Sequence, residues 1–128
     1  RFFQMHLESR ISDIEDRPTL DSQVLDHVSR ALSEGVPKIS DVAGHLGLGA
    51  RTLQRRLAEG GHSYQSLVDE ARRRLSARLL GETDFSLSEI AFMTGFADQS
   101  AFTRAFRRWT GQTPGAFRAA AVEDEPPS

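Results

Sequence analysis

The amino-acid sequence predicts an all-α fold in which two helix-turn-helix subdomains are joined by one long central helix. Apolar residues recur at three- and four-residue steps, and no sustained alternation of β-branched residues predicts a strand. Residues 39–47 also recur as residues 87–95, with apolar, serine, acidic, alanine and glycine positions in the same order. We therefore expect a first subdomain over 19–62, a connecting helix over 63–81 and a second subdomain over 82–120.

Composition is that of an ordinary globular protein, with 38% apolar and 27% charged residues in a chain of 128. No apolar run approaches the ~18 residues of a membrane span, and polar residues interrupt the opening positions that a signal peptide would keep apolar. The chain has no cysteine, so disulfides and thiolate metal clusters are excluded. We expect a cytoplasmic protein with no membrane partner, no metal and no cofactor.

The first elements follow from two apolar stripes. Residues 1–18 are expected to be a linker or the remnant of an upstream domain, in which four apolar residues could line a helix that Pro18 stops. They are Phe3, Leu7, Ile11 and Ile14. A helix within 20–34 is expected next, because its apolar stripe precedes the stop signals Gly35 and Pro37. This stripe consists of Leu20, Val24, Leu25, Val28 and Leu32.

The connecting helix carries the longest helical pattern of the chain. Ser63 can cap its first turn and Gly81 can end it. Its apolar residues are Tyr64, Leu67, Val68, Ala71, Leu75 and Leu79. Most of its arginines fall off that stripe, toward solvent or a ligand. These are Arg72, Arg73, Arg74 and Arg78.

A last helix should begin at Thr113, with Pro114 in its first turn. We expect this helix to turn Phe117 inward and Arg118 outward. Residues 121–128 are acidic and proline-rich, so we expect a disordered tail there.

The two repeated segments meet the physical requirements of a helix-turn-helix. A small residue, Ala43 or Ala91, lets two helices approach closely, and a glycine four residues later supplies the positive φ of the turn. Those glycines are Gly47 and Gly95. Ser86–Glu89 also forms a capping-box sequence at the start of the second copy. Two copies with matching flanks favour a true helix-turn-helix over a chance pattern.

Charge is distributed unevenly. The net charge of −2 argues against nucleic-acid binding, yet residues 51–78 hold seven arginines against three acids. A solvated helix face is the alternative explanation of such a stretch.

The second helix of the first unit exposes side chains suited to bases. If Leu53 and Leu57 face inward, the opposite face carries residues at i, i+3 and i+4. The residues expected to contact bases are Arg51, Gln54 and Arg55. Arginine can pair with guanine and glutamine with adenine through two hydrogen bonds. Arg56, one step around the helix, is expected to contact a phosphate.

The second helix of the second unit turns Phe102 and Phe106 inward. The residues expected to contact bases there are Gln99, Ser100 and Thr103, and those expected to contact phosphates are Arg104, Arg107 and Arg108. Surface polar residues without a function are the alternative for any one of them. The helical pattern of the connecting helix covers residues 63–80, and these eighteen residues would span about 27 Å. This length is close to the ~34 Å between successive major-groove faces of DNA.

These residues resemble the C-terminal DNA-binding region of AraC/XylS-family bacterial transcription regulators. The strongest match runs from Glu89 to Arg108 and continues from Gly111 to Arg118. The first unit, from Val42 to Leu57, resembles members with a large upstream sensor domain. It departs from many members at Gly49 and Ala50, where they carry a capping serine.

The resemblance implies a seven-helix all-α fold that reads an asymmetric promoter site with two recognition helices in successive major grooves. It also implies regulation of transcription by an effector, sensed by an N-terminal domain outside this sequence, which would provide most of any dimerisation. The implied partners are double-stranded promoter DNA and RNA polymerase.

Two other classes of function are alternatives to DNA binding. An enzyme has little support, because the four histidines lack metal spacing and neither a nucleophile elbow nor a phosphate loop occurs. His45 and His62 are expected to be surface or capping residues. A helical module that binds an acidic protein partner through its arginines, such as a piece that binds a sigma factor or polymerase, is the stronger rival. Titration of promoter DNA across salt concentrations separates the two, because DNA binding should weaken steeply with salt.

Overall fold

The computed structural model describes residues 18–124, which form seven α-helices, one 3₁₀ turn and no strand within that range. The predicted all-α fold is therefore confirmed. The elements are α2 (Leu20–Ala31), η1 (Leu32–Glu34), α3 (Ile39–His45), α4 (Ala50–Glu59), α5 (Tyr64–Glu82), α6 (Leu87–Met93), α7 (Gln99–Thr110) and α8 (Pro114–Asp124). The predictions for residues 1–17 and 125–128 lie outside the described residues.

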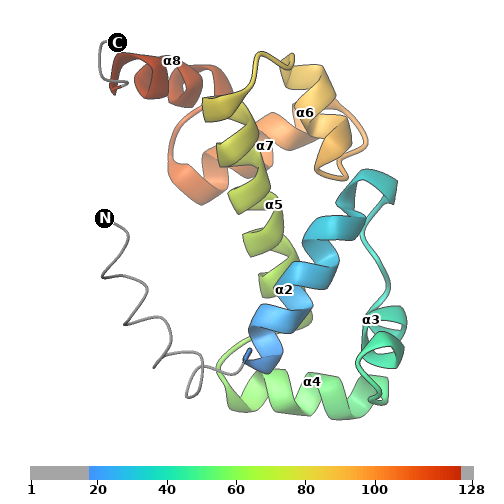
Figure 1. Cartoon of the computed structure of the whole chain (residues 1–128). Helices are drawn as coiled ribbons and strands as arrows, with labels where there is room; N and C mark the ends of the chain where they lie inside the picture. The colour runs from blue at the N-terminus through green and yellow to red at the C-terminus, as the bar shows by residue number, and fades with distance from the viewer. Residues whose placement is uncertain (1–17, 125–128) are drawn as a thin grey trace, which may run out of the picture.

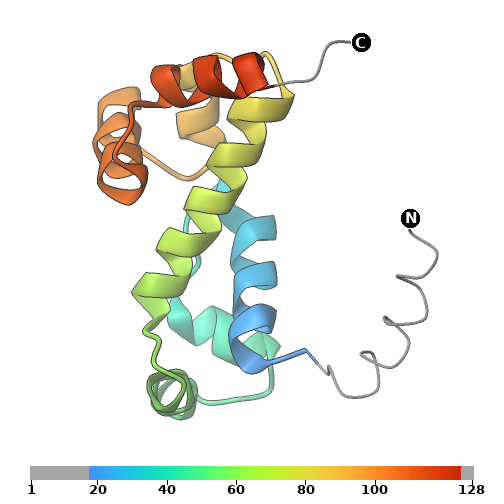
Figure 2. The ribbon, with the colours of Figure 1, turned by 90° about the vertical axis from the view of Figure 1, so that its left-hand side faces the viewer.

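The central helix α5 connects two separate groups of helices (Figure 1). Helices α2, α3 and α4 gather around its first half, and α6, α7 and α8 around its second half (Figure 2). Its 19 residues correspond to a length of about 28 Å. The two recognition helices of the predicted pattern, α4 and α7, thus lie near opposite ends of one rigid element.

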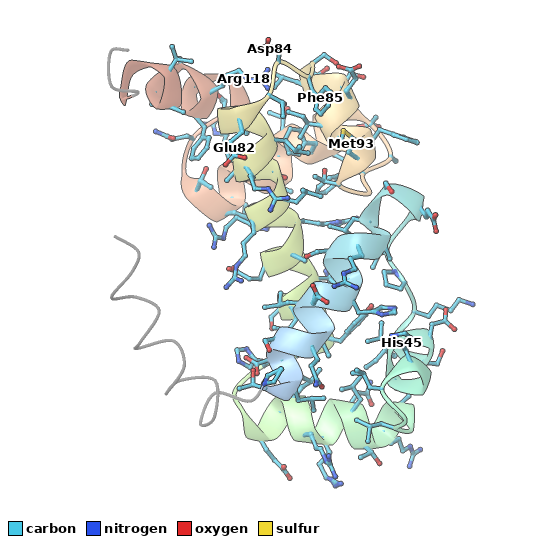
Figure 3. The ribbon with its side chains drawn as sticks, viewed as in Figure 1. His45, Glu82, Asp84, Phe85, Met93 and Arg118 are labelled. Carbon is cyan, nitrogen blue, oxygen red and sulfur yellow. The ribbon has the colours of Figure 1, made fainter. Side chains whose placement is uncertain are left out.

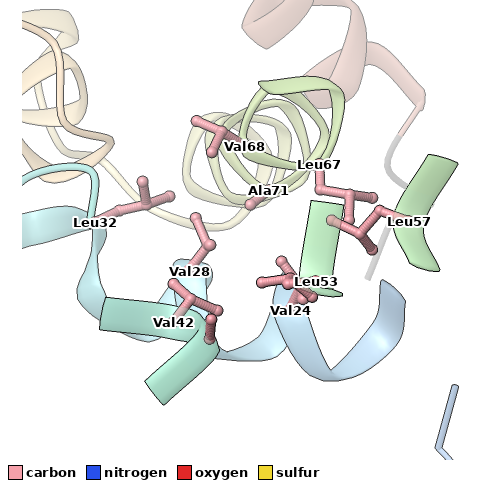
Figure 4. Packing of buried hydrophobic residues seen from close by; sticks show 10 residues of the cluster. Val24, Val28, Leu32, Val42, Leu53, Leu57, Leu67, Val68 and Ala71 are labelled. Carbon is pink, nitrogen blue, oxygen red and sulfur yellow. The ribbon is translucent and has the colours of Figure 1, made fainter. Parts of the chain in front are cut away.

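Each group has its own hydrophobic core. The first core is aliphatic and joins α2, α3 and α4 to α5 (Figure 4). Its fully buried residues include Val24, Val28, Leu32, Val42, Leu53 and Leu57. The second core is largely aromatic and is built around Phe102 and Phe106 of α7. Leu75 packs against both cores, so α5 links them.

Local sequence determines where these helices begin. The Ser63 hydroxyl accepts a hydrogen bond from the Ser66 amide at 3.0 Å, which caps α5. Ser86 and Glu89 form the expected capping box of α6, in which each side chain bonds the other residue's backbone amide. Thr113 caps α8 through the Ala116 amide at 3.1 Å.

The prediction of a disordered tail from residue 121 onward is wrong as far as Asp124, because α8 continues to that residue. Two physical reasons account for the longer helix. Residues 119–121 are alanines, which have the highest helix propensity. The helix also lies against α5, where a methyl group added at Gly81 would stand 3.9 Å from the Ala121 methyl.

The prediction that Arg118 faces outward is also wrong, although Phe117 packs into the second core as expected. The Arg118 guanidinium folds back onto the end of α5 (Figure 3). It donates hydrogen bonds to the backbone carbonyl oxygens of Leu80 at 3.0 Å, Phe85 at 2.7 Å and Thr83 at 3.1 Å. The last carbonyls of a helix lack intrahelical partners, and Arg118 donates hydrogen bonds to such carbonyls at the end of α5.

Candidate nucleic-acid interface

Both repeated segments form the predicted helix-turn-helix. Gly47 and Gly95 have φ angles of +75° and +85°, which confirms the left-handed turn that the spacing required. Each turn closes with the same backbone hydrogen bond, from Leu48 to the Ala43 carbonyl at 2.8 Å and from Phe96 to the Ala91 carbonyl at 2.9 Å. The alanines are buried and let the paired helices approach.

Helix α4 buries one face and exposes a polar one. Leu53 and Leu57 are buried, whereas all four side chains predicted to bind DNA are exposed. Arg51, Gln54 and Arg55 border one shallow depression on the surface. Sequence reasoning missed Thr52, which borders the same depression. Its position three residues before Arg55 on the same helix was the available signal.

Helix α7 repeats this arrangement. Phe102 and Phe106 are fully buried. On the other face, a second shallow depression is bordered by Gln99, Ser100, Thr103 and Arg104. Arg104 therefore lies among the side chains predicted to read bases rather than apart from them. Arg107 and Arg108 are exposed toward the end of the helix, and Thr103 is half-buried.

The charges of the arginines on the two recognition helices are not neutralised by ion pairs among the described side chains. Among the side chains that the structure describes, no ion pair involves any arginine of α4 or α7. These arginines are Arg51, Arg55, Arg56, Arg104, Arg107 and Arg108. Each of the two helices therefore carries three arginines outside any ion pair of the described side chains, on a chain whose formal net charge is −2.

Three of the four arginines of α5 that are predicted to point toward solvent or a ligand form hydrogen bonds within the domain. Arg73 and Arg74 both pair with Glu70, at 2.7 and 2.6 Å. The hydrogen bond from Arg73 is the main reason that the pKa of Glu70 lies below its ordinary value. Arg72 is half-buried against the turn of the second unit, and that burial lowers its pKa. Only Arg78 of this group stays exposed without an ion pair among the described side chains.

The two recognition helices start differently. The Asp98 carboxylate caps α7 by accepting a hydrogen bond from the Ala101 amide at 2.8 Å. The N-cap of α4 is Gly49, which offers no side chain. The first amides of α4 are thus left to solvent or to a bound group.

None of the three histidines in the described part of the chain borders either of these two depressions. His62 lies 3.4 Å from the Asp21 carboxylate, and His45 stacks on His27 with 4.5 Å between ring centroids (Figure 3). Within residues 18–124, no cluster of three or more potential metal ligands occurs. In the same range, no helix combines the length and hydrophobicity needed to cross a membrane.

Comparison with known proteins decides the family. The family profile described as a helix-turn-helix domain matches residues 42–120, which include both repeats. The HTH-type transcriptional regulator VirS of Mycobacterium tuberculosis is 37% identical over 119 residues. That match covers 93% of this chain and 34% of VirS. A transcriptional regulator with an AraC-type DNA-binding domain from Chromobacterium violaceum has the same fold, with a TM-score of 0.75, 21% identity, and coverage of 83% of this chain and 95% of that one.

The chain belongs to the AraC-type helix-turn-helix family of transcriptional regulators. A further AraC-type neighbour, the DNA-binding domain of the global transcriptional factor AdpA, was solved in complex with a target DNA. It superposes with a TM-score of 0.68 at 28% identity, covering 84% of this chain and 97% of that domain. This chain spans about a third of the length of VirS.

Proposed function

We propose that this AraC-type domain binds double-stranded promoter DNA in a sequence-specific manner, with α4 and α7 in successive major grooves. One observation supports this most strongly. Two exposed polar depressions, each built on the second helix of a helix-turn-helix, lie near opposite ends of α5. The length of α5, about 28 Å, approaches the ~34 Å of one DNA turn.

The side chains divide into two proposed roles. Arg51, Gln54 and Arg55 of α4 would contact bases, with Gln99, Ser100 and Thr103 of α7 as the second set. Phosphates would be bound by Arg56, Arg104, Arg107 and Arg108. The first set is chemically stronger, because each of its three residues can form two hydrogen bonds with one base in the bidentate geometry, whereas in the second set only Gln99 can.

The wider role is proposed for the full-length regulator. It would control transcription in response to an effector bound by an N-terminal domain, which would also mediate dimerisation, and it would act on RNA polymerase at the promoter. The support for these points is the family membership and the fraction of VirS, 34%, that this chain spans.

The test begins with selection of bound sequences from a random DNA pool, followed by titration at several salt concentrations. With four phosphates neutralised, the affinity should fall by about two orders of magnitude between 50 and 200 mM salt. Arg55→Ala should weaken binding to the selected site by about 1–3 kcal/mol and relax its specificity. Arg30→Ala is the matched control, because Arg30 is an exposed arginine on α2, outside both recognition helices.

Absence of DNA binding at low salt would refute the proposal. If Arg55→Ala lost the same affinity for selected and for random DNA, Arg55 would be assigned to phosphate binding instead of base contact. Arg56→Ala should weaken binding about equally on all sequences and reduce the salt slope by about one.

A further inference from the structure

The turn of the second helix-turn-helix lies where three elements meet. Arg72 reaches from α5 to this turn and donates two hydrogen bonds, from Nε to the Thr94 carbonyl at 3.1 Å and from Nη2 to the Gly95 carbonyl at 2.7 Å. Its guanidinium also lies 4.1 Å from the centroid of the Phe96 ring. One side chain therefore holds three consecutive residues of the turn.

The first subdomain reaches the same point. A Cβ atom built on Gly95 would stand 3.3 Å from the Leu32 carbonyl oxygen of η1 and 3.4 Å from Arg72 Nη2. Leu32 is itself fully buried in the first core. The turn between α6 and α7 is thus enclosed by η1 of the first subdomain on one side and by Arg72 on another.

No such junction holds the first turn. A Cβ atom built on Gly47 would meet nothing within 4 Å. Among the side-chain contacts of residues 18–124, Arg73 and Arg74 of α5 bond to Glu70 of the same helix and to no other residue. Arg72 is therefore the α5 arginine that ties the helix to a helix-turn-helix unit.

The chemistry of these contacts makes them difficult to replace. A guanidinium presents several donors in a fixed plane and can stack on an aromatic ring, whereas a lysine ammonium is a point charge on a flexible stem. Loss of Arg72 would leave two carbonyls at a half-buried site without these charge-assisted hydrogen bonds. The turn that leads into α7 would lose its hydrogen bonds to the middle of α5, and Arg118, at the far end of α5, would be left to hold the second unit by polar contacts.

We propose that Arg72 is a positioning residue that fixes α7 relative to α4, so that the domain accepts its two half-sites at one spacing only. This inference rests on the proposed DNA-binding function. Each base pair inserted between the half-sites rotates one of them by about 34–36° around the helix axis. A rigid reader cannot follow that rotation, but a reader with a mobile second unit can.

The first arm of the test needs no DNA. The chain lacks cysteine, so spin labels can be attached after Ala58→Cys on α4 and Ser100→Cys on α7, two exposed positions. Pulsed electron–electron double resonance should give one narrow distribution of distances between the two labels in the otherwise unaltered chain. Arg72→Ala should broaden or shift it, and Arg78→Ala, which removes the same charge from an exposed position on α5, should leave it unchanged.

The second arm measures binding to the selected site and to versions with one or two base pairs inserted between the half-sites. The unaltered chain should lose about tenfold or more in affinity for each insertion, as for a mismatched base pair. Arg72→Ala should bind the selected site more weakly but lose less than about threefold on insertion. Arg78→Ala should keep the full spacing penalty.

Unchanged distance distributions together with an unchanged spacing penalty in Arg72→Ala would overturn the inference. If Arg72→Ala fails to give the circular dichroism of the folded chain, Arg72→Lys replaces it, since lysine keeps the charge but not the paired geometry. If the unaltered chain binds no DNA, the proposed function fails, and the spin-label distances alone decide whether Arg72 fixes α7.

Discussion

The two helix-turn-helix units share a backbone motif but are stabilised in different ways. The first has an aliphatic core, an uncapped recognition helix and a turn whose glycine is open to solvent. The second has an aromatic core, an aspartate cap and a turn enclosed by η1 and Arg72. The motif itself requires only the small residue, the turn glycine and the i,i+4 apolar pair, so everything else can differ.

This difference coincides with a difference in surface chemistry. The first unit presents Arg51, Gln54 and Arg55, all suited to bidentate base contacts, whereas two of the three predicted base-contacting residues of the second unit are the small Ser100 and Thr103. We infer that the first unit contributes more to sequence discrimination. The second depends more on being held in position, which gives Arg72 its importance.

The largest expected effect concerns the aromatic core. Phe106 is fully buried and lies 5.2 Å from Phe117 and 5.8 Å from Phe102, measured between ring centroids. Phe106→Ala should lower the free energy of unfolding by about 3–5 kcal/mol. Urea denaturation followed by the fluorescence of Trp109, the single tryptophan, measures this within the second unit.

The control is Phe92→Ala, in the same unit, because 68% of Phe92 is exposed. Its effect should stay within about 0.5 kcal/mol. Similar losses in both variants would show that the aromatic core is not what stabilises this unit.

The next effect compares the two turn glycines. Both have positive φ, so alanine should cost about 1–2 kcal/mol at either position. At Gly95 the new methyl also approaches the Leu32 carbonyl, a backbone atom that cannot swing away, and this should add about 1–3 kcal/mol. Thermal and urea unfolding of Gly47→Ala and Gly95→Ala should therefore differ. Equal destabilisation by the two substitutions would mean that η1 and Arg72 move away from the new methyl group at position 95 at no cost in free energy.

A smaller effect concerns the caps of the recognition helices. Asp98→Ala removes the bond to the Ala101 amide and should cost about 1 kcal/mol. Gly49 has an extended conformation, φ −81° and ψ 157°, with space around it. Gly49→Ser should therefore stabilise the chain by a few tenths of a kcal/mol, about the difference between glycine and serine caps. Calorimetric melting measures both changes in stability. A lower stability of Gly49→Ser would contradict the expectation that a serine caps α4 better than glycine.

The features that sequence could predict are those encoded within a few residues. Capping boxes, turn glycines and buried i,i+4 pairs all depend on neighbours along the chain, and the structure confirms them at Ser86, Gly47 and Gly95. The exposed faces of α4 and α7 followed from the same periodicity. The assignment of individual side chains there to bases or phosphates stays a prediction.

The features that sequence could not predict depend on distant backbone. Arg72 bonds to carbonyls 22 and 23 residues away, and Arg118 to carbonyls up to 39 residues away. Periodicity shows only that a charged side chain lies off the apolar stripe of its helix, and such a side chain is normally exposed to solvent. The end of α8 is a different case, because the alanines before Val122 already favoured a longer helix.

The smallest effect concerns α5 itself, which belongs to both cores. Glu70 accepts hydrogen bonds from Arg73 and Arg74, and its pKa is lowered below the ordinary 4.5, chiefly by Arg73. A carboxylate whose pKa is lowered by folding stabilises the folded chain above its unfolded pKa. That contribution is lost as the pH falls through the folded pKa. Because the pairs are partly exposed, Glu70→Gln should cost less than about 1 kcal/mol at pH 7.

The cost of Glu70→Gln should shrink toward zero as the pH falls from about 4.5 through the lowered pKa of Glu70. Urea unfolding at a series of pH values measures it, with Glu34→Gln as a control at an exposed acid that forms no ion pair among the described side chains. Because α5 packs into both cores, circular dichroism and Trp109 fluorescence should report the same loss. A loss of stability seen only by Trp109 fluorescence would show that the second unit unfolds separately. The two units would then not unfold cooperatively, although both pack on α5.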